Sequence, residues 1–424
     1  MTEAVSISAE SATSIRLGRW WQLTLGVICM SMIANLQYGW TLFVNPIHDK
    51  HGWSVATIQV AFTVFVLVET WLVPIEGYLV DRFGPRYVGV VAGVLVALAW
   101  VINSAANSLP MLYLGAVVGG VGAGAVYGAC VGNALKWFPD RRGLAAGITA
   151  MGFGAGSALT VFPIANMIKS SGYETTFFNF GIAQGIVVFI VSWFLRAPAA
   201  NYSVSRPTPA VGSAAVRTRE YTPLEMLASP AFWVMFIMFV LTAVGGLIAT
   251  AQLTPIAKDF GIEKSTVSMV GITTLALPFA LSLNRVLNGV SRPFFGWVSD
   301  VLGREQTMFV AFAIEGAVIL MLSQFGHNPV GFVIFTGLLF FAYGEIYSLF
   351  PAICGDAYGR KFASANAGLL YVAKGVASMV VPLANVIAAS AAGWNGVFVA
   401  AAAMNFIAAL LAIAVLKPLR ARSS

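Results

Sequence analysis

The chain has 424 residues, of which 58% are hydrophobic and only 10% are charged. A soluble globular protein carries about 25% charged residues, so this composition excludes one and makes lipid the solvent of the chain. The net charge of +7 would suit a nucleic-acid partner, but its distribution excludes that partner as well. Cys29, Cys130 and Cys354 lie in apolar runs, which predicts neither a disulfide framework nor a metal site.

Twelve apolar runs are long enough to cross a bilayer as α-helices. A transmembrane helix needs about 20 mainly apolar residues, and each run approaches or exceeds that length. In chain order the predicted spans cover residues 20–45, 54–79, 87–105, 110–136, 142–168, 174–196, 230–257, 265–296, 306–324, 329–353, 363–390 and 393–417.

Basic residues are unequally divided between the two sides of these spans. If both termini are cytoplasmic, 17 of the 24 Lys and Arg residues lie on the cytoplasmic side or at the cytoplasmic end of a span, four outside and three in the interior of spans. Basic loops stay on the cytoplasmic side of membranes, so the excess charge indicates topology rather than nucleic-acid binding. We expect a multi-pass protein of the cell membrane, the inner membrane in a bacterium, with both termini in the cytoplasm.

Residues 197–229 interrupt the apolar pattern. They are rich in Pro, Ser, Ala and Arg and contain no long apolar run. This composition predicts a cytoplasmic linker. It divides the chain into an N-terminal six-helix bundle, residues 1–196, and a C-terminal six-helix bundle, residues 230–424.

The two predicted bundles repeat one another. Residues 77–86 (GYLVDRFGPR), after the second span, recur as residues 296–304 (GWVSDVLGR) after the eighth, at an offset of 219 residues. A second match, at an offset of 221 residues, aligns glycines of the fifth and eleventh spans. Many transporters are built from such repeats, with the substrate site between them near the membrane midplane.

The repeated loop resembles the loop between helices 2 and 3 of the major facilitator superfamily. The resemblance implies an all-α membrane protein with twelve transmembrane helices in two pseudo-symmetric six-helix bundles. It also implies that Asp81 and Arg82 latch the two halves together on the cytoplasmic side. The second copy has Asp300 but Val301 in place of the basic residue, which predicts a weaker latch. The alternative is a basic turn that only sets topology.

Three cations lie inside predicted spans, Arg285 and Arg292 in the eighth and Lys374 in the eleventh. Intramembrane charge is costly and usually faces a pathway or a charged partner. From the helical rise, Arg292 lies about 12 Å and Lys374 about 20 Å from the cytoplasmic edge of a core about 30 Å thick. The repeat places the apolar Val73 and Phe153 at the matching N-terminal positions. We predict a carboxylate-binding pair, with bidentate contact from Arg292 and a point charge on Lys374. The alternative is an internal ion pair with a buried Glu.

Four acids lie within or near the spans. Glu69 lies about 18 Å and Glu345 about 16 Å from the cytoplasmic edge, which is midplane depth, and both are predicted to couple or gate transport. Glu76 is predicted to brace the loop that carries Asp81. The sequence offers no account of Glu315.

Aromatic and amide side chains complete the predicted site. Tyr371 precedes Lys374 by three residues and shares its helix face, and Tyr343 and Tyr347 share another face. Tyrosine combines an apolar wall with a hydroxyl donor, which suits a small anion, although each ring could instead only pack between helices. The predicted substrate-binding residues are Arg292, Lys374, Gln37, Tyr38, Tyr127, Tyr343, Tyr347 and Tyr371.

Longer segments resemble the oxalate:formate antiporter branch of the superfamily. They include residues 37–42 (QYGWTL), 136–145 (KWFPDRRGLA), 288–296 (NGVSRPFFG) and 371–374 (YVAK). The resemblance implies that Arg292 and Lys374 bind a dicarboxylate. Glu69, Glu345 and Arg285 depart from it, because these positions are uncharged in that antiporter.

We therefore expect a secondary active transporter that exchanges small organic anions, such as oxalate and formate, by alternating access. The alternative is a proton-coupled symporter for a monocarboxylate or small sulfonate, since a buried carboxyl such as Glu69 could take up a proton. The sequence has no HExxH motif, paired membrane aspartates or Ser–His set, so we expect no enzyme activity, metal or cofactor. The expected partners are small carboxylate anions, protons and the lipid bilayer, with no nucleic acid, and the protein is expected to act as a monomer.

Overall fold

The computed structural model describes residues 9–199, 202, 219–262, 264–269, 271–388, 390 and 393–423. The N-terminal part contains α1 (Ala9–Tyr38), α2 (Thr41–His51), α3 (Val55–Trp71), α4 (Val73–Phe83), α5 (Pro85–Ser104), α6 (Leu109–Trp137) and α7 (Arg142–Ser192). The C-terminal part contains α8 (Pro223–Leu227), α9 (Pro230–Asp259), β1 (Thr266–Met269), β2 (Ile272–Leu275), α10 (Ala276–Leu302), α11 (Arg304–Phe325), α12 (Pro329–Tyr343), α13 (Ile346–Tyr358), α14 (Ala363–Ala388), α15 (Gly393–Leu411), the π-helical turn Ala412–Leu416 and α16 (Lys417–Ser423).

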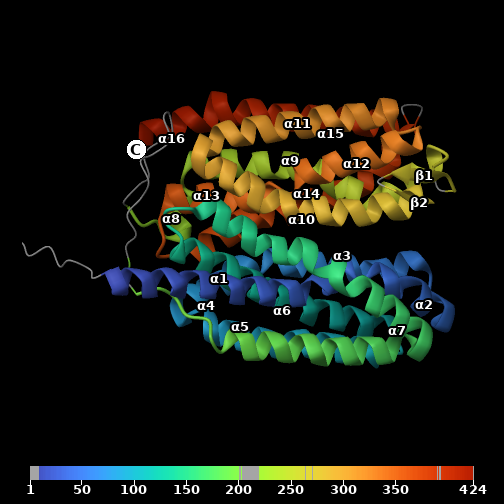
Figure 1. The fold of residues 1–424 in the computed structure, drawn as a ribbon, viewed down its shortest axis with the longest axis horizontal. Helices are drawn as coiled ribbons and strands as arrows, with labels where there is room; N and C mark the ends of the chain where they lie inside the picture. Colours follow the sequence, from blue (N-terminus) through green and yellow to red (C-terminus); the bar gives the residue numbers. More distant parts are fainter. Residues whose placement is uncertain are drawn as a thin grey trace, which may run out of the picture.

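The long helices form two groups that lie side by side (Figure 1). One group holds α1–α7 and the other holds α9–α16, and they meet where α10 packs on α7 and α14 packs on α4 and α6. The strands and α2 lie at one end of the molecule, which we call the hairpin end. The opposite end carries α8 and α16, and we call it the α8 end.

The connection between the two groups is only partly described. Within the predicted linker, residues 200–201 and 203–218 lie outside the described residues. The described part contains α8, where the Thr222 hydroxyl accepts from the Glu225 backbone N–H and the Glu225 carboxylate accepts from that of Thr222. The division of the chain at residues 196/197 and 229/230 stays a prediction.

Several predicted spans are bent or broken. α3 and α4 form the second span with a bend of 43°, where Pro74 has no N–H to continue the helical ladder. α7 covers the fifth and sixth spans and is interrupted at Gly172, whose φ of 81° is not helical. Among the described residues, seven helical spans are long and apolar enough to cross a membrane, or nine with the two bent pairs. The cation-bearing α10 and α14 are not among them.

The predicted eighth span, residues 265–296, begins differently from the prediction. It begins with the strands β1 and β2, which pair as a short antiparallel hairpin with Thr266 opposite Leu275 and Met269 opposite Ile272, and the helix starts only at Ala276. The segment is rich in β-branched residues, which favour strands, and Gly271 at φ 75° supplies the turn. Hydropathy alone could not separate this apolar hairpin from the helix that follows.

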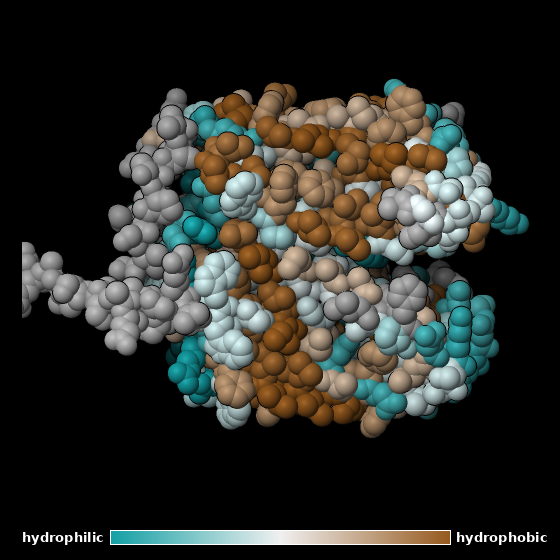
Figure 2. Space-filling model, viewed as in Figure 1, coloured by the Kyte–Doolittle hydropathy of each residue, from teal (hydrophilic) through white to brown (hydrophobic). Residues whose placement is uncertain are grey.

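The outer surface of the helices is apolar, as the brown areas of Figure 2 show. On α5 the exposed residues Tyr87, Val91, Val94 and Leu98 recur at helical spacing. The opposite face of α5 is buried and rich in Gly and Ala, which lets neighbouring helices approach closely. An apolar outside over a closely packed inside is the arrangement that a lipid solvent requires.

Candidate functional site

A cavity of about 470 Å³ lies between the two groups of helices. Figure 2 shows the gap between the groups at the hairpin end. We call this space the outer cavity. It is lined by Gln37, Tyr38, Trp40, Gln59, Phe62, Thr63, Val66, Leu67, Leu247, Thr250, Ala251, Gln252, Arg285, Ser378 and Met379.

The predicted charged site lies deeper than the outer cavity on three of its helices. Glu69 follows the lining residue Val66 by three positions, and Lys374 precedes the lining residue Ser378 by four. Arg292 follows the lining residue Arg285 by seven positions. These depths correspond to one or two helical turns toward the α8 end. We call Glu69, Arg292, Tyr347, Tyr371 and Lys374 the inner cluster.

Glu69 and Lys374 form an ion pair between the two halves. The Lys374 Nζ lies 3.2 Å from the Glu69 Oε2, and both side chains are completely buried. The Tyr371 hydroxyl donates to the Glu69 Oε1 at 3.2 Å and accepts from the Lys374 Nζ at 2.8 Å. The carboxylate of Glu69 thus pairs with Lys374, which the sequence analysis predicts to bind the substrate. Pairing with a cation of the other half is one way to relieve the cost of a buried charge.

Arg292 is also fully buried, but its partners are neutral. Its Nη1 donates to the Ala150 carbonyl at 2.7 Å, and its Nη2 donates to the Asn288 side-chain oxygen at 2.8 Å. The guanidinium lies 4.2 Å from the centre of the Tyr347 ring. Its Nε has no hydrogen-bond partner among the described residues. The inner cluster therefore carries one uncompensated positive charge, with donor capacity left for an anion.

Tyrosine rings enclose these cations. Tyr127 of the N-terminal half stacks on Tyr371 of the C-terminal half, with centroids 4.3 Å apart and planes at 18°. The Tyr343 and Tyr347 hydroxyls lie 2.9 Å apart. Tyr38 lies nearer the hairpin end, and Gln37 lines the outer cavity beside it. The structure therefore brings the eight predicted substrate-binding residues to one region, two on the outer cavity and six in or around the inner cluster.

Among the described residues, Glu345 and Glu315 form no ion pair or side-chain hydrogen bond with the inner cluster. Glu345 lies in the turn between α12, which ends at Tyr343, and α13, which begins at Ile346, whereas Tyr347 contacts Arg292. Both acids are fully buried, and none of their carboxylate oxygens has a hydrogen-bond partner among the described residues. The predicted gating role of Glu345 would thus have to act through helix packing, because Glu345 does not line the outer cavity.

The α8 end is closed by contacts between the two halves. Asp81 at the end of α4 accepts from the backbone N–H groups of Ser364 and Ala365, which begin α14, at 3.3 and 2.9 Å. Its cation partner is Lys136 at 2.6 Å. The carboxylate thus binds the N-terminus of a helix from the other half, where the helix dipole favours negative charge. We call this set of contacts the first latch.

Arg82 does not take part in the first latch. Its side chain is exposed, and its guanidinium lies 5.3 Å from the centre of the Phe83 ring on its own helix. The acid that is predicted to latch the halves does contact the other half, but Lys136 supplies the positive charge. No sequence signal pointed to Lys136 as the partner of Asp81, because the two residues are 55 positions apart.

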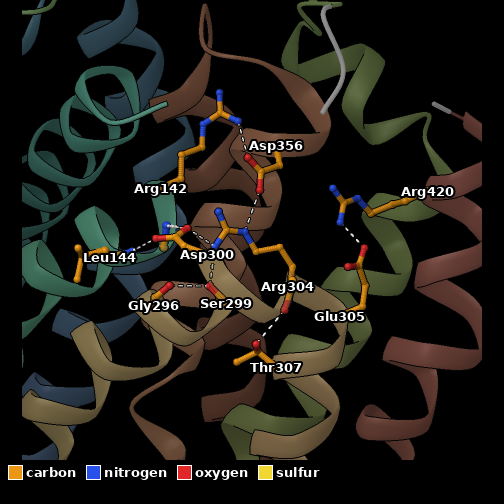
Figure 3. Close-up of polar contacts among 12 residues, drawn as sticks. Arg142, Leu144, Gly296, Ser299, Asp300, Arg304, Glu305, Thr307, Asp356 and Arg420 are labelled. Atoms are coloured by element: carbon orange, nitrogen blue, oxygen red, sulfur yellow. Dashed lines mark hydrogen bonds and ion pairs between the residues drawn. The ribbon is translucent and has the colours of Figure 1, made fainter. Parts of the chain in front are cut away.

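A second latch repeats the first in the other direction, as Figure 3 shows. Asp300 of α10 accepts from the Gly143 and Leu144 backbone N–H groups at the start of α7, at 3.0 and 2.8 Å. Arg304 lies 2.6 Å from Asp300. The second latch is therefore as complete as the first, contrary to the weaker latch expected from Val301. Arg304, four residues after Asp300 at the start of α11, supplies the missing positive charge.

A buried acid strengthens the second latch. Asp356 at the end of α13 accepts from Arg142 at 2.6 Å and from Arg304 at 2.8 Å (Figure 3). Arg142 belongs to the N-terminal half, so this network also joins the halves. Glu305 and Arg420 form a further buried ion pair close by (Figure 3).

The family model of the Major Facilitator Superfamily matches residues 23–286 and 246–424, which together cover most of the chain. The chain belongs to the major facilitator superfamily. It is therefore a secondary transporter and not an enzyme, a multi-pass membrane protein with the twelve-helix fold of that superfamily.

Comparisons with individual members of the superfamily agree. The oxalate:formate antiporter of Oxalobacter formigenes is 33% identical over 402 residues, which cover 95% of this chain and 92% of the antiporter. The solved structure of the proton:xylose symporter XylE matches 94% of this chain and 96% of its own with a TM-score of 0.69 at 11% identity. FucP in the outward conformation matches 92% of this chain and 98% of its own with a TM-score of 0.67 at 16% identity. These two likenesses concern the fold.

One member of the site in this major facilitator protein was not predicted. Phe153 of α7 lies between Tyr38, at 5.2 Å, and Lys374, whose Nζ is 5.8 Å from the ring centre. The repeat had already aligned Phe153 with Lys374. Residues at matching positions of two facing repeats approach the pseudo-symmetry axis together, so that alignment was the available signal.

Proposed function

We propose that the protein exchanges small carboxylate anions, of the oxalate and formate kind, across the cell membrane. The observation that carries this proposal is the buried Arg292, which has only neutral partners among the described residues and contacts the same Tyr347 ring as Lys374 of the ion pair. A buried cation with a free donor suits the planar oxygens of a carboxylate. The oxalate:formate antiporter that shares 33% identity supports the same substrate class.

The ion pair suggests how the substrate enters the inner cluster. In the empty carrier Glu69 neutralises Lys374. Within the inner cluster, a carboxylate contacts Arg292 and then replaces Glu69 as the partner of Lys374. Because the replacement of Glu69 by the substrate breaks an ion pair between the two halves, binding changes the free energy of the state in which the halves are in contact at the inner cluster. Glu69 neutralises only Lys374, so Arg292 stays uncompensated until an anion binds, and the carrier returns readily only with an anion bound.

The orientation of the protein is part of the proposal. We place the α8 end, which carries α8, the start of α1 and α16, in the cytoplasm. The two latches then close the cytoplasmic side, and the outer cavity opens to the outside. Alternating access requires both latches to separate while the outer cavity closes.

The Glu69–Lys374 pair also favours a second candidate function, proton-coupled symport of a monocarboxylate or small sulfonate. With Glu69 ionised, the inner cluster has a net charge of +1, which matches a monoanion. If Glu69 instead takes a proton when Lys374 binds the substrate, a proton travels with the anion. The two functions therefore differ in whether Glu69 stays charged during the transport step.

Counterflow in proteoliposomes tests the proposal. The purified protein would be reconstituted with one internal anion and offered radiolabelled oxalate, formate, longer carboxylates and small sulfonates at two pH values. Exchange predicts saturable uptake that requires an internal carboxylate. Symport predicts uptake into empty vesicles that is driven by a proton gradient. The absence of uptake for every carboxylate and sulfonate would refute both functions.

A further inference from the structure

Arg285 is the third cation within the spans, and the inner cluster does not use it. It lines the outer cavity and is only partly buried. Its guanidinium lies 4.6 Å from the centre of the Tyr38 ring. No ion pair or hydrogen bond joins Arg285 to another residue in the part of the chain that the structure describes. A cation placed in a membrane cavity without an acid partner is costly unless it serves a ligand.

The surroundings of Arg285 suit an anion. None of the residues that line the outer cavity is acidic, so Arg285 gives it a net positive charge. Gln37, Gln59, Thr63 and Gln252 add amide and hydroxyl groups that can donate hydrogen bonds. The Gln59 side-chain oxygen accepts from the Trp40 ring at 3.3 Å, which leaves its amide group as a donor. Low-dielectric walls around a single charge sign concentrate ions of the opposite sign.

Arg285 also has a defined position relative to the inner cluster. It precedes Arg292 by seven residues on α10, which places the two guanidinium groups on one face about two turns, or roughly 10 Å, apart along the helix. The inner cations are fully buried, whereas Arg285 reaches the outer cavity. An anion that enters from the hairpin end therefore meets Arg285 before it meets Arg292.

We propose that Arg285, with Tyr38 and the glutamines of the outer cavity, forms an outer anion-binding site that is separate from the inner cluster. The anion rests there while Glu69 still holds Lys374, and it then moves about two helical turns inward to displace Glu69. This step rests on the proposed function, because it makes a small carboxylate the occupant of the outer site. The positive charge of the outer cavity itself does not depend on which anion is transported.

Charge-selective labelling of a cysteine measures that positive charge directly. Thr63 lines the outer cavity and is exposed, and the native cysteines Cys29, Cys130 and Cys354 are buried. In a Thr63→Cys protein, the labelling rates of an anionic ethylsulfonate and a cationic trimethylammonium methanethiosulfonate would be compared. Arg285→Gln should lower the anion-to-cation rate ratio about tenfold, because one unit charge is removed at short range in a medium of reduced dielectric.

Matched variants separate the charge of Arg285 from general effects. Arg285→Lys should keep most of the ratio, and Lys258→Gln, a charge change at an exposed cation of the hairpin end outside the outer cavity, should leave it unchanged. Ser378→Cys provides a second reporter if Thr63→Cys does not fold. An equal ratio with Arg285 and with Arg285→Gln at both reporters would overturn the outer site.

Protection of the reporter cysteine then identifies the occupant. In a Lys374→Gln background, where the inner cluster is damaged, oxalate and formate should still slow the labelling of Thr63→Cys. Adding Arg285→Gln should raise the anion concentration needed for this protection at least tenfold. Protection that persists without Arg285 would place the anion elsewhere and refute the site. If no carboxylate protects Thr63→Cys even when Arg285 and Lys374 are both intact, the proposed substrate class is wrong. The ratio of labelling rates still decides whether Arg285 attracts anions.

Discussion

At the scale of single residues, Glu69 and Lys374 form a buried ion pair. Both side chains are completely buried, and each is the ionic partner of the other. Removing one member of such a pair leaves the other as an uncompensated buried charge, which costs about 3 kcal/mol or more. The stability and the transport roles of the pair can therefore be separated by comparing single and double variants.

Lys374→Gln should abolish carboxylate counterflow and lower the free energy of unfolding by about 3 kcal/mol. Adding Glu69→Gln should restore most of that stability, because neither charge is then unpaired, but it should not restore counterflow. Thermal unfolding in detergent and uptake in proteoliposomes measure the two effects. Arg292→Gln should also abolish counterflow, and full uptake with both cation variants would rule out the inner cluster as the substrate site.

Glu69→Gln by itself tests the coupling role of the carboxyl. The amide cannot gain or lose a proton, so uptake should become less dependent on pH, and the net charge of the inner cluster rises to +2. In competition assays we expect the affinity for dicarboxylates to rise relative to that for monocarboxylates, because a dianion then matches the charge of the site. Glu76→Gln is the matched control, a buried acid on the same bent span outside the inner cluster. An unchanged pH profile and substrate ranking would make Glu69 a purely structural residue.

At the scale of helices, two glycines of the repeated motif allow the halves to touch at the α8 end. A Cβ atom on Gly77 would lie 2.5 Å from the Ser364 carbonyl oxygen, and one on Gly296 would lie 2.1 Å from the Gly143 carbonyl oxygen. Both distances are too short for a side chain, and in each case the obstacle is backbone of the other half. The motif therefore places glycine where α4 and α10 rest on the starts of α14 and α7.

Gly77→Ala and Gly296→Ala should push these helices apart and favour separation of the α8 end. As the outer cavity closes in that state, labelling of Thr63→Cys should slow several-fold. Gly18→Ala is the control, because a Cβ there meets nothing within 4 Å. An unaffected labelling rate in both motif variants would mean that the halves relax without changing the access state.

At the scale of the whole molecule, the two latches join the N-terminal and C-terminal halves of the protein at the α8 end. Asp81 reaches from the N-terminal half to the start of α14, and Asp300 reaches from the C-terminal half to the start of α7. Each carboxylate accepts two backbone N–H groups and pairs with a cation. Because these contacts lie far from the inner cluster, they stabilise one access state rather than the bound substrate.

Asp81→Asn should slow turnover while the equilibrium affinity for substrate changes little, and Asp300→Asn should act the same way. The double variant should shift the state populations further than either single one, since both contacts must break together. Thr63→Cys labelling reports the populations, and binding assays report the affinity. Asp259→Asn, at the hairpin end, is the control. A collapse of binding without a change of state population would contradict the latch.

Much of this arrangement was predictable from the sequence. The spans, the internal repeat and the three intramembrane cations follow from local patterns, because lipid excludes charge wherever a helix crosses it. The resemblance of the repeated loop to the superfamily pointed to Asp81 and Asp300, and both contact the other half. The hairpin before α10 escaped prediction because an apolar, β-branched segment has the same hydropathy as a helix.

The pairing of side chains between helices was decided only by the tertiary structure. Depth along a helix can be counted from the sequence, but the rotation and tilt of each helix cannot, and these determine which side chains meet. In the folded protein, Lys374 is the partner of Glu69, and Lys136 rather than Arg82 is the partner of Asp81. Arg285 lines the outer cavity. Glu345 shares the predicted depth of the inner cluster, yet it lies in the turn between α12 and α13, and its carboxylate oxygens have no hydrogen-bond partner among the described residues.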